Sequence, residues 1–175
     1  MRQSFLAIAI TLLLHSNALF AQNYKLDERN GFRDAKLGML RSDLPGLVEK
    51  TAGPNDKLLK VYSRPTDKLE IGPFKLTSIE YVFYKDYLHS IRIWAHGLTS
   101  GNGIRDVLLE EYGPAQKLDY LGRPSAWLGT NVTMRYNIND FPTGYFVDVH
   151  ILSNSLMRQV KLDNENAIKT ATSDL

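Results

Sequence analysis

The segment from Thr77 to His96 constrains the fold more than any other part of the sequence. It contains two runs in which β-branched and aromatic residues alternate with others, separated by Lys85-Asp86. Alternation with a period of two is typical of a half-buried strand, and a short polar break between two such runs predicts an antiparallel hairpin. We expect one side to face the core, namely Ile79, Tyr81, Phe83, Ile91 and Ile93. The side that points the other way carries Glu80, Tyr84, Arg92, Trp94 and His96.

The N-terminal 21 residues resemble a processing segment. Arg2 precedes an apolar run from Phe5 to Leu14, and a short stretch of polar and small residues ends at Ala21. The run is shorter than the roughly 20 apolar residues of a membrane-spanning helix, so we interpret residues 1–21 as a bacterial signal peptide that is cleaved after Ala21. The alternative is an uncleaved N-terminal anchor. Export predicts a periplasmic or secreted protein, and residues 22–30 are expected to form a flexible lead-in.

The chain has 175 residues and no cysteine. It therefore cannot form disulfides, use a thiol nucleophile, ligate zinc through cysteine or carry the lipid of an exported bacterial lipoprotein. The net charge of +2 falls to +1 when Arg2 leaves with the signal peptide, which is too small to indicate nucleic acid or an anionic membrane surface as a partner. This length fits one domain, which we expect over residues 31–162, followed by a frayed polar tail over 163–175.

Three helices are expected within this domain, the last a short one that begins near Ser155 and carries Leu156, Met157 and Val160. A short helix with Leu44, Leu47 and Val48 on one side should begin near Ser42 or Asp43 and end before Gly53-Pro54. A second helix should follow a glycine-rich loop over 97–103 and end before Gly113-Pro114, because its apolar residues recur at helical spacing. Its apolar stripe comprises Ile104, Val107, Leu108 and Tyr112.

The two halves of the domain, about 40–97 and 100–153, share one order of features. Each is expected to contain a helix and then three strands, which predicts an α+β fold. We expect a single antiparallel sheet with helices packed on one face and two pseudo-repeated αβββ halves. The matching features are Ala52-Gly-Pro54 with Tyr112-Gly-Pro114, Ser63-Arg-Pro65 with Gly122-Arg-Pro124, Ile79–Tyr84 with Val132–Asn137, and Ile91–Trp94 with Val147–His150.

This organisation resembles the tandem αβββ architecture of the β-lactamase inhibitor protein and the BamE-like (SmpA/OmlA) superfamily. The resemblance rests on Lys36-Leu-Gly-Met39 before a short helix, on the Gly-Pro pairs that end the helices, and on the two long hairpins. It covers about residues 31–153 at the level of architecture. It implies that helices cover one face of the sheet and leave the other face open, while members of the superfamily differ widely in partner.

The outward side of the sheet is the candidate binding face. Exposed aromatic and arginine side chains on a rigid sheet are typical of protein interfaces. We expect an exported, non-enzymatic binding or scaffold module without a cofactor, whose partner is a protein or ligand in the cell envelope or outside the cell. The alternative is that these aromatic residues only shield the sheet, or contact the C-terminal tail or a second copy. The binding residues are Tyr84, Arg92, Trp94, His96, Arg135, Phe146, Asp148 and His150, with Glu80, Thr133 and Asn137 on the same side and Tyr62, Tyr120 and Trp127 at the rim.

A metal-assisted hydrolase is the alternative from a different class. Asp148 and His150 lie two residues apart on one expected strand, so their side chains emerge on the same side. Together with His96 they offer two imidazoles and a carboxylate, which are zinc ligands, or a carboxylate that orients a histidine base. A structural envelope protein without a specific ligand is a third possibility.

Overall fold

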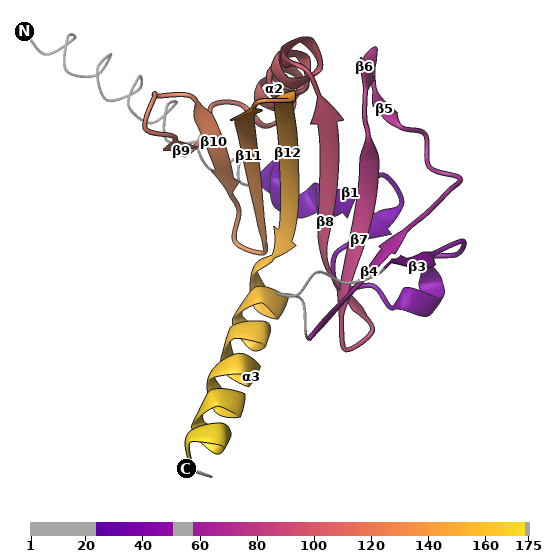
Figure 1. Cartoon of the computed structure of the whole chain (residues 1–175), viewed down its shortest axis with the longest axis vertical. Helices are drawn as coiled ribbons and strands as arrows, with labels where there is room; N and C mark the ends of the chain where they lie inside the picture. The colour runs from indigo at the N-terminus through magenta and orange to yellow at the C-terminus, as the bar shows by residue number, and fades with distance from the viewer. Residues whose placement is uncertain (1–23, 51–57, 174–175) are drawn as a thin grey trace, which may run out of the picture.

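The computed structural model describes residues 24–50 and 58–173 as an α+β fold built on a large antiparallel sheet (Figure 1). The expected signal peptide, its cleavage site and the Gly53-Pro54 helix end lie outside these residues. The main sheet has eight strands in the order β3-β4-β7-β8-β12-β11-β10-β9. Its strands are β3 (Val48–Lys50), β4 (Leu59–Ser63), β7 (Ser78–Tyr84), β8 (Tyr87–His96), β9 (Lys117–Leu118), β10 (Pro124–Leu128), β11 (Val132–Phe141) and β12 (Gly144–Ser153).

The expectation of a single sheet was wrong, because two small hairpins stand apart from the main sheet. They are β1 (Gly31–Phe32) with β2 (Ala35–Lys36), and β5 (Glu70–Ile71) with β6 (Phe74–Lys75). Each has only two residues per strand.

The hairpin expected from Thr77 to His96 is confirmed as β7 and β8, which form the centre of the main sheet with β12. Lys85 and Asp86 both have positive φ, at 48° and 64°. Two consecutive residues with positive φ give the twist that a two-residue hairpin turn needs. Ile79 lies opposite Ile93 and Tyr81 opposite Ile91, so the expected apolar side is continuous across both strands.

The core lies between this apolar side and α2 (Leu98–Tyr112), which crosses the sheet together with the β1–β2 hairpin on the same face (Figure 1). The helix begins earlier than expected and contains Gly101 and Gly103, which we had placed in a loop. A β-carbon on Gly101 would lie 2.5 Å from Val147 Cγ2, and one on Gly103 would lie 2.1 Å from the Phe74 ring. These glycines therefore serve close packing between the helix and its neighbours.

The first expected helix is absent from the described residues. A 3₁₀ helix, Arg41–Asp43, is followed by strand β3. Gly46 has a φ of +78°, which a regular right-handed helix cannot accommodate, and Pro45 precedes it. The local apolar spacing of Leu44, Leu47 and Val48 was misleading, because Val48 is 52% exposed.

Both ends of the described chain are helical, in segments expected to be a lead-in and a polar tail. Residues 24–29 are helical and bury Leu26 in the core. At the other end, α3 (Asn154–Ser173) runs well past the short helix that we expected to stop near Val160, and it projects from the end of β12 (Figure 1). Among the described helices, none is long and apolar enough to cross a membrane.

Candidate functional site

The face of the main sheet opposite α2, which we call the open face, carries the expected outward residues in register across β7, β8, β12 and β11. Phe146 lies opposite His96, Asp148 opposite Trp94, and His150 opposite Arg92. On the other side of β12, Arg135 lies opposite His150 and Asn137 opposite Asp148. Sequence alternation alone therefore assigned these side chains to the correct face, since every second residue of a strand points the same way.

Aromatic rings form a ladder at one end of the open face. The His96 and Phe146 rings are 4.9 Å apart with an edge-to-face angle of 73°, and the Phe146 and Phe141 rings are 5.6 Å apart at 75°. Trp94 lies one register position below, half-buried. Phe141 was not among the expected binding residues; it joins the ladder because β11 runs on to Phe141 before the Pro142-Thr143 turn. Phe141 is 52% exposed, so the ladder presents apolar surface to solvent.

Charged residues form a row on the open face beyond Trp94 and Asp148. Glu80 lies opposite Arg92 in β8 and forms an ion pair with Lys50 at 2.5 Å. Arg135 is exposed and makes no ion pair with a described residue. The row therefore has excess positive charge at its β11 end, where Arg135 lies.

Asp148 lies between the aromatic ladder and the basic row. Its Oδ2 accepts a hydrogen bond of 2.9 Å from Asn137 Nδ2. Burial raises the pKa of the Asp148 carboxyl, while the Asn137 hydrogen bond and the Arg92 charge act in the opposite direction. A carboxyl whose desolvation outweighs two stabilising neighbours is held in a partly dry environment.

Tyr84 does not belong to the accessible part of this face. It is only 2% exposed, because its hydroxyl donates a hydrogen bond to Asp163 of α3. Lys85 also forms an ion pair with Asp163, at 2.6 Å. Two of the expected rim residues were assigned wrongly as well. Tyr62 and Trp127 are 4% and 1% exposed and pack in the core, where the Trp127 indole donates to the Gly113 carbonyl at 2.8 Å.

The trio for the metal alternative is not brought together. His96 lies opposite Phe146 whereas His150 lies opposite Arg92, four residues away along β8. At about 3.3 Å per residue, this offset separates the two imidazoles by roughly 13 Å along the strands, well beyond the span of one metal ion. Among the residues that the structure describes, no group of three histidine or acidic side chains could hold a metal ion.

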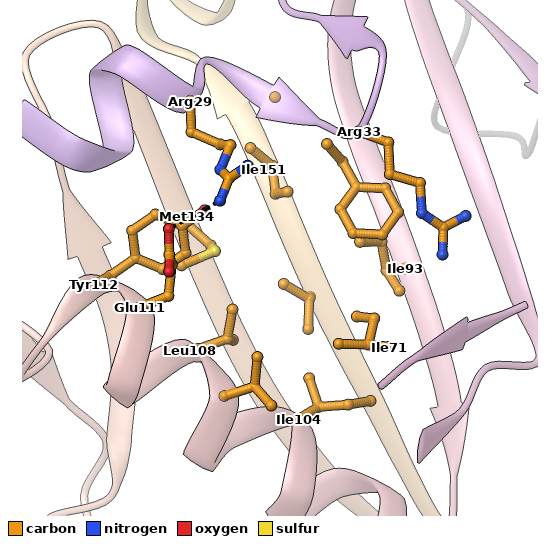
Figure 2. Close-up of a pocket in the computed structure, with 14 residues that line it drawn as sticks. Arg29, Arg33, Ile71, Ile93, Ile104, Leu108, Glu111, Tyr112, Met134 and Ile151 are labelled. Carbon is orange, nitrogen blue, oxygen red and sulfur yellow. Dashed lines mark hydrogen bonds and ion pairs between the residues drawn. The ribbon is translucent and has the colours of Figure 1, made fainter. Parts of the chain in front are cut away.

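A second feature lies on the opposite face and was not visible in the sequence. An apolar cavity of about 280 Å³ opens between α2, the β1–β2 hairpin and the main sheet (Figure 2). Its walls come from elements far apart in the chain, so no local pattern could indicate it. Its lining includes Ile93, Met134 and Ile151 of the sheet and Ile104, Val107 and Leu108 of α2. Arg29, Arg33 and Glu111 lie at its charged edge.

No protein-family model, curated protein or solved structure matches this chain. The expected resemblance to the BamE-like superfamily stays a prediction.

Proposed function

We propose that this protein is an exported, non-enzymatic binding module that docks a protein partner on its open face. The observation that carries the proposal is the exposed ladder of His96, Phe146 and Phe141, with Trp94 beside it. Rigid aromatic side chains supply large contact area at low entropic cost, which is why they dominate interface energetics. Three neighbouring strands hold this ladder, so little ordering is needed when a partner binds.

The chemistry of the face favours a partner segment that combines apolar side chains with carboxylates. Arg92 and Arg135 flank His150 in the row beyond Trp94 and Asp148, and Arg135 is exposed. An arginine beside aromatic surface can bind a carboxylate in bidentate fashion while the apolar part of the segment packs on the rings. Asp148 and Glu80 are the acids nearby, and each already has a polar or charged neighbour.

Two further parts of the proposal concern origin and location. The main sheet is centred on the β8–β12 pair. From the edge toward this pair, one half reads β4-β7-β8 and the other reads β10-β11-β12, which supports two related halves. This arrangement is also compatible with the tandem architecture of the BamE-like superfamily. Export, through the segment 1–21, would bring the open face to partners in the periplasm or outside the cell.

A random peptide library displayed on phage, selected against the full protein, tests this proposal. We expect enrichment of peptides in which Asp or Glu lies next to aromatic or aliphatic residues. Affinity of an enriched synthetic peptide should fall about tenfold or more in Phe146→Ala and in Phe141→Ala, because buried aromatic anchors contribute most to such interfaces.

Tyr24→Ala is the matched control, because Tyr24 is a 66% exposed aromatic residue in the helical residues 24–29, which contact Glu111 of α2 on the other side of the sheet. It should bind the enriched peptide like the unchanged protein. Phe141 is half-exposed, so its replacement should leave the melting temperature nearly unchanged and separate loss of binding from loss of folding. The proposal fails if no consensus peptide emerges, or if Phe141→Ala and Phe146→Ala both retain full affinity.

A further inference from the structure

We propose that the cavity between α2, the β1–β2 hairpin and the sheet binds a single-chain amphiphile, with its apolar tail inside and a carboxylate head at the arginine edge. This site is separate from the open face, since it lies on the other side of the sheet. The proposal does not depend on the partner proposed above.

The walls of the cavity are hydrocarbon and thioether side chains. Ile93 and Met134 from the sheet and Ile104 from α2 are each at most 2% exposed, yet they border empty space. Protein interiors are otherwise packed with few voids larger than a water molecule. An apolar void offers water no hydrogen-bond partner, so it stays dry and accepts apolar molecules instead.

The size of the cavity suits a ligand larger than one small ring. Its volume of about 280 Å³ is nearly twice the roughly 150 Å³ of an engineered apolar cavity that takes up benzene. Phe32 of β1 and Ile71 of β5 also line it, and both are only half-buried. Val107 of α2 is 38% exposed and lies at the edge of the cavity, so the space communicates with the surface there.

The charged edge selects the head group. Arg29 and Arg33 lie on either side of the apolar side chains, and Glu111 stands next to Arg29 (Figure 2). Arg29 Nη2 pairs with Glu111 Oε1 at 2.9 Å, which neutralises one of the two guanidinium groups.

Arg33 keeps its charge available. Its Nη2 donates to the Glu70 carbonyl oxygen at 2.7 Å, and its guanidinium lies 4.6 Å from the centre of the Phe32 ring. The adjacent carboxylate of Asp34 is held instead by Arg64 at 2.7 and 2.8 Å. Because Arg33 has an excess positive charge next to an apolar cavity, a carboxylate head complements it better than a neutral or cationic head.

The experiment uses three probes with a straight ten-carbon chain, the carboxyl carbon of decanoate included, and different heads: decanoate, decanol and decyltrimethylammonium. Methionine methyl groups labelled with ¹³C report where each probe binds, because Met134 lies in the cavity wall and Met157 lies on α3. We expect saturable shifts of the Met134 methyl signal with decanoate, weaker ones with decanol and none with the ammonium compound. Met157 should not respond.

Two variants and a control sharpen the test. Val107→Trp places a large ring at the edge of the cavity and should abolish the Met134 response, while the half-exposed position keeps the helix intact. Arg33→Gln should weaken decanoate about fivefold, the effect expected for one partly exposed charged hydrogen bond, and leave decanol unchanged. Arg158→Gln, on the exposed side of α3, is the charge-matched control and should behave like the unchanged protein.

Three outcomes would overturn the proposal. The first is no response of Met134 to decanoate at saturation. The second is an equal response of Met134 and Met157, which would indicate detergent-like binding over the whole surface. The third is decanoate binding that Arg33→Gln leaves unchanged, which would remove the carboxylate from the proposal.

Discussion

Asp27 and Thr130 are joined by a hydrogen bond of 2.8 Å, although 103 residues separate them in the chain. The same carboxylate also accepts the backbone N–H groups of Asn131 at 2.8 Å and Val132 at 3.0 Å. One side chain from the helical residues 24–29 thus satisfies consecutive backbone donors at the start of β11. Gly129 lies so close that a β-carbon there would be 2.3 Å from Asp27 Oδ1.

Asp27→Ala should lower the free energy of unfolding by about 2 kcal/mol, because it leaves backbone donors of the 130–132 segment without their charged acceptor. Asp27→Asn should cost less, about 1 kcal/mol, since one oxygen remains. Urea denaturation measures both. Glu28→Ala, an exposed neighbour, is the control and should change little. Equal stabilities of Asp27→Ala and Glu28→Ala would contradict this role.

Gly101→Ala should destabilise the protein although alanine is the better helix former by about 1 kcal/mol. The new methyl would lie 2.5 Å from Val147 Cγ2, and overpacking of this kind costs about 1–3 kcal/mol. Thermal unfolding measures the change. The double variant Gly101→Ala, Val147→Ala removes the clash, so it should be less destabilised than the sum of the two single variants. Additive effects would show that Gly101 has no packing role.

Arg64 should be among the residues most sensitive to replacement near the first hairpin. Its guanidinium binds Asp67 at 2.7 Å, and the side chains of Arg64 and Asp67 are 10% and 4% exposed. Arg64→Ala leaves the Asp67 carboxylate buried without its cation, which costs about 3 kcal/mol. The stability of Arg64→Lys should lie between that of the unchanged protein and that of Arg64→Ala, because lysine keeps the charge but cannot bind two carboxylates with a planar fork. Chemical denaturation at neutral pH tests the order.

The same cluster should also make stability depend on acid pH. The hydrogen bonds from Arg64 lower the pKa of Asp34 to about 2. An unfolded aspartate has a pKa of about 3.9, so the contribution of this pair is present above that value and is lost as the pH falls from about 4 toward 2. Asp34→Asn should flatten stability over this window. If Asp34→Asn loses as much stability between about pH 4 and 2 as the unchanged protein, Asp34 is not the source of this pH dependence.

Asp148 should produce a pH dependence of the opposite sign. Because burial raises its folded pKa, the unfolded chain loses the proton first and stability falls as the pH rises from about 4 through the folded pKa. Asp148→Asn keeps an oxygen for the Asn137 hydrogen bond and removes the ionisation. It should be more stable than the unchanged protein at pH 7, and the two should converge near pH 3. Exposed Asp140→Asn serves as the control.

The central hairpin was predictable from the sequence, and so was the face on which the candidate residues lie. Alternation in Ser78–Tyr84 and Tyr87–His96 identified the strands, their turn and their apolar side, since those properties depend on neighbours within a few residues. Gly46 shows the limit of that approach. A positive φ at this residue ended a helix that apolar spacing had favoured.

Contacts between distant segments decided the rest. The reach of Asp27 to the 130–132 segment, the burial of Tyr84 under Asp163 and the cavity beside Met134 all join residues that are remote in the chain. By itself the sequence determined the strands, the turn and the parity of the open face, because a strand exposes every second residue whatever surrounds it. Only the tertiary structure decided which of those residues stay accessible and where the core leaves a void, because both depend on which surfaces meet when the layers pack.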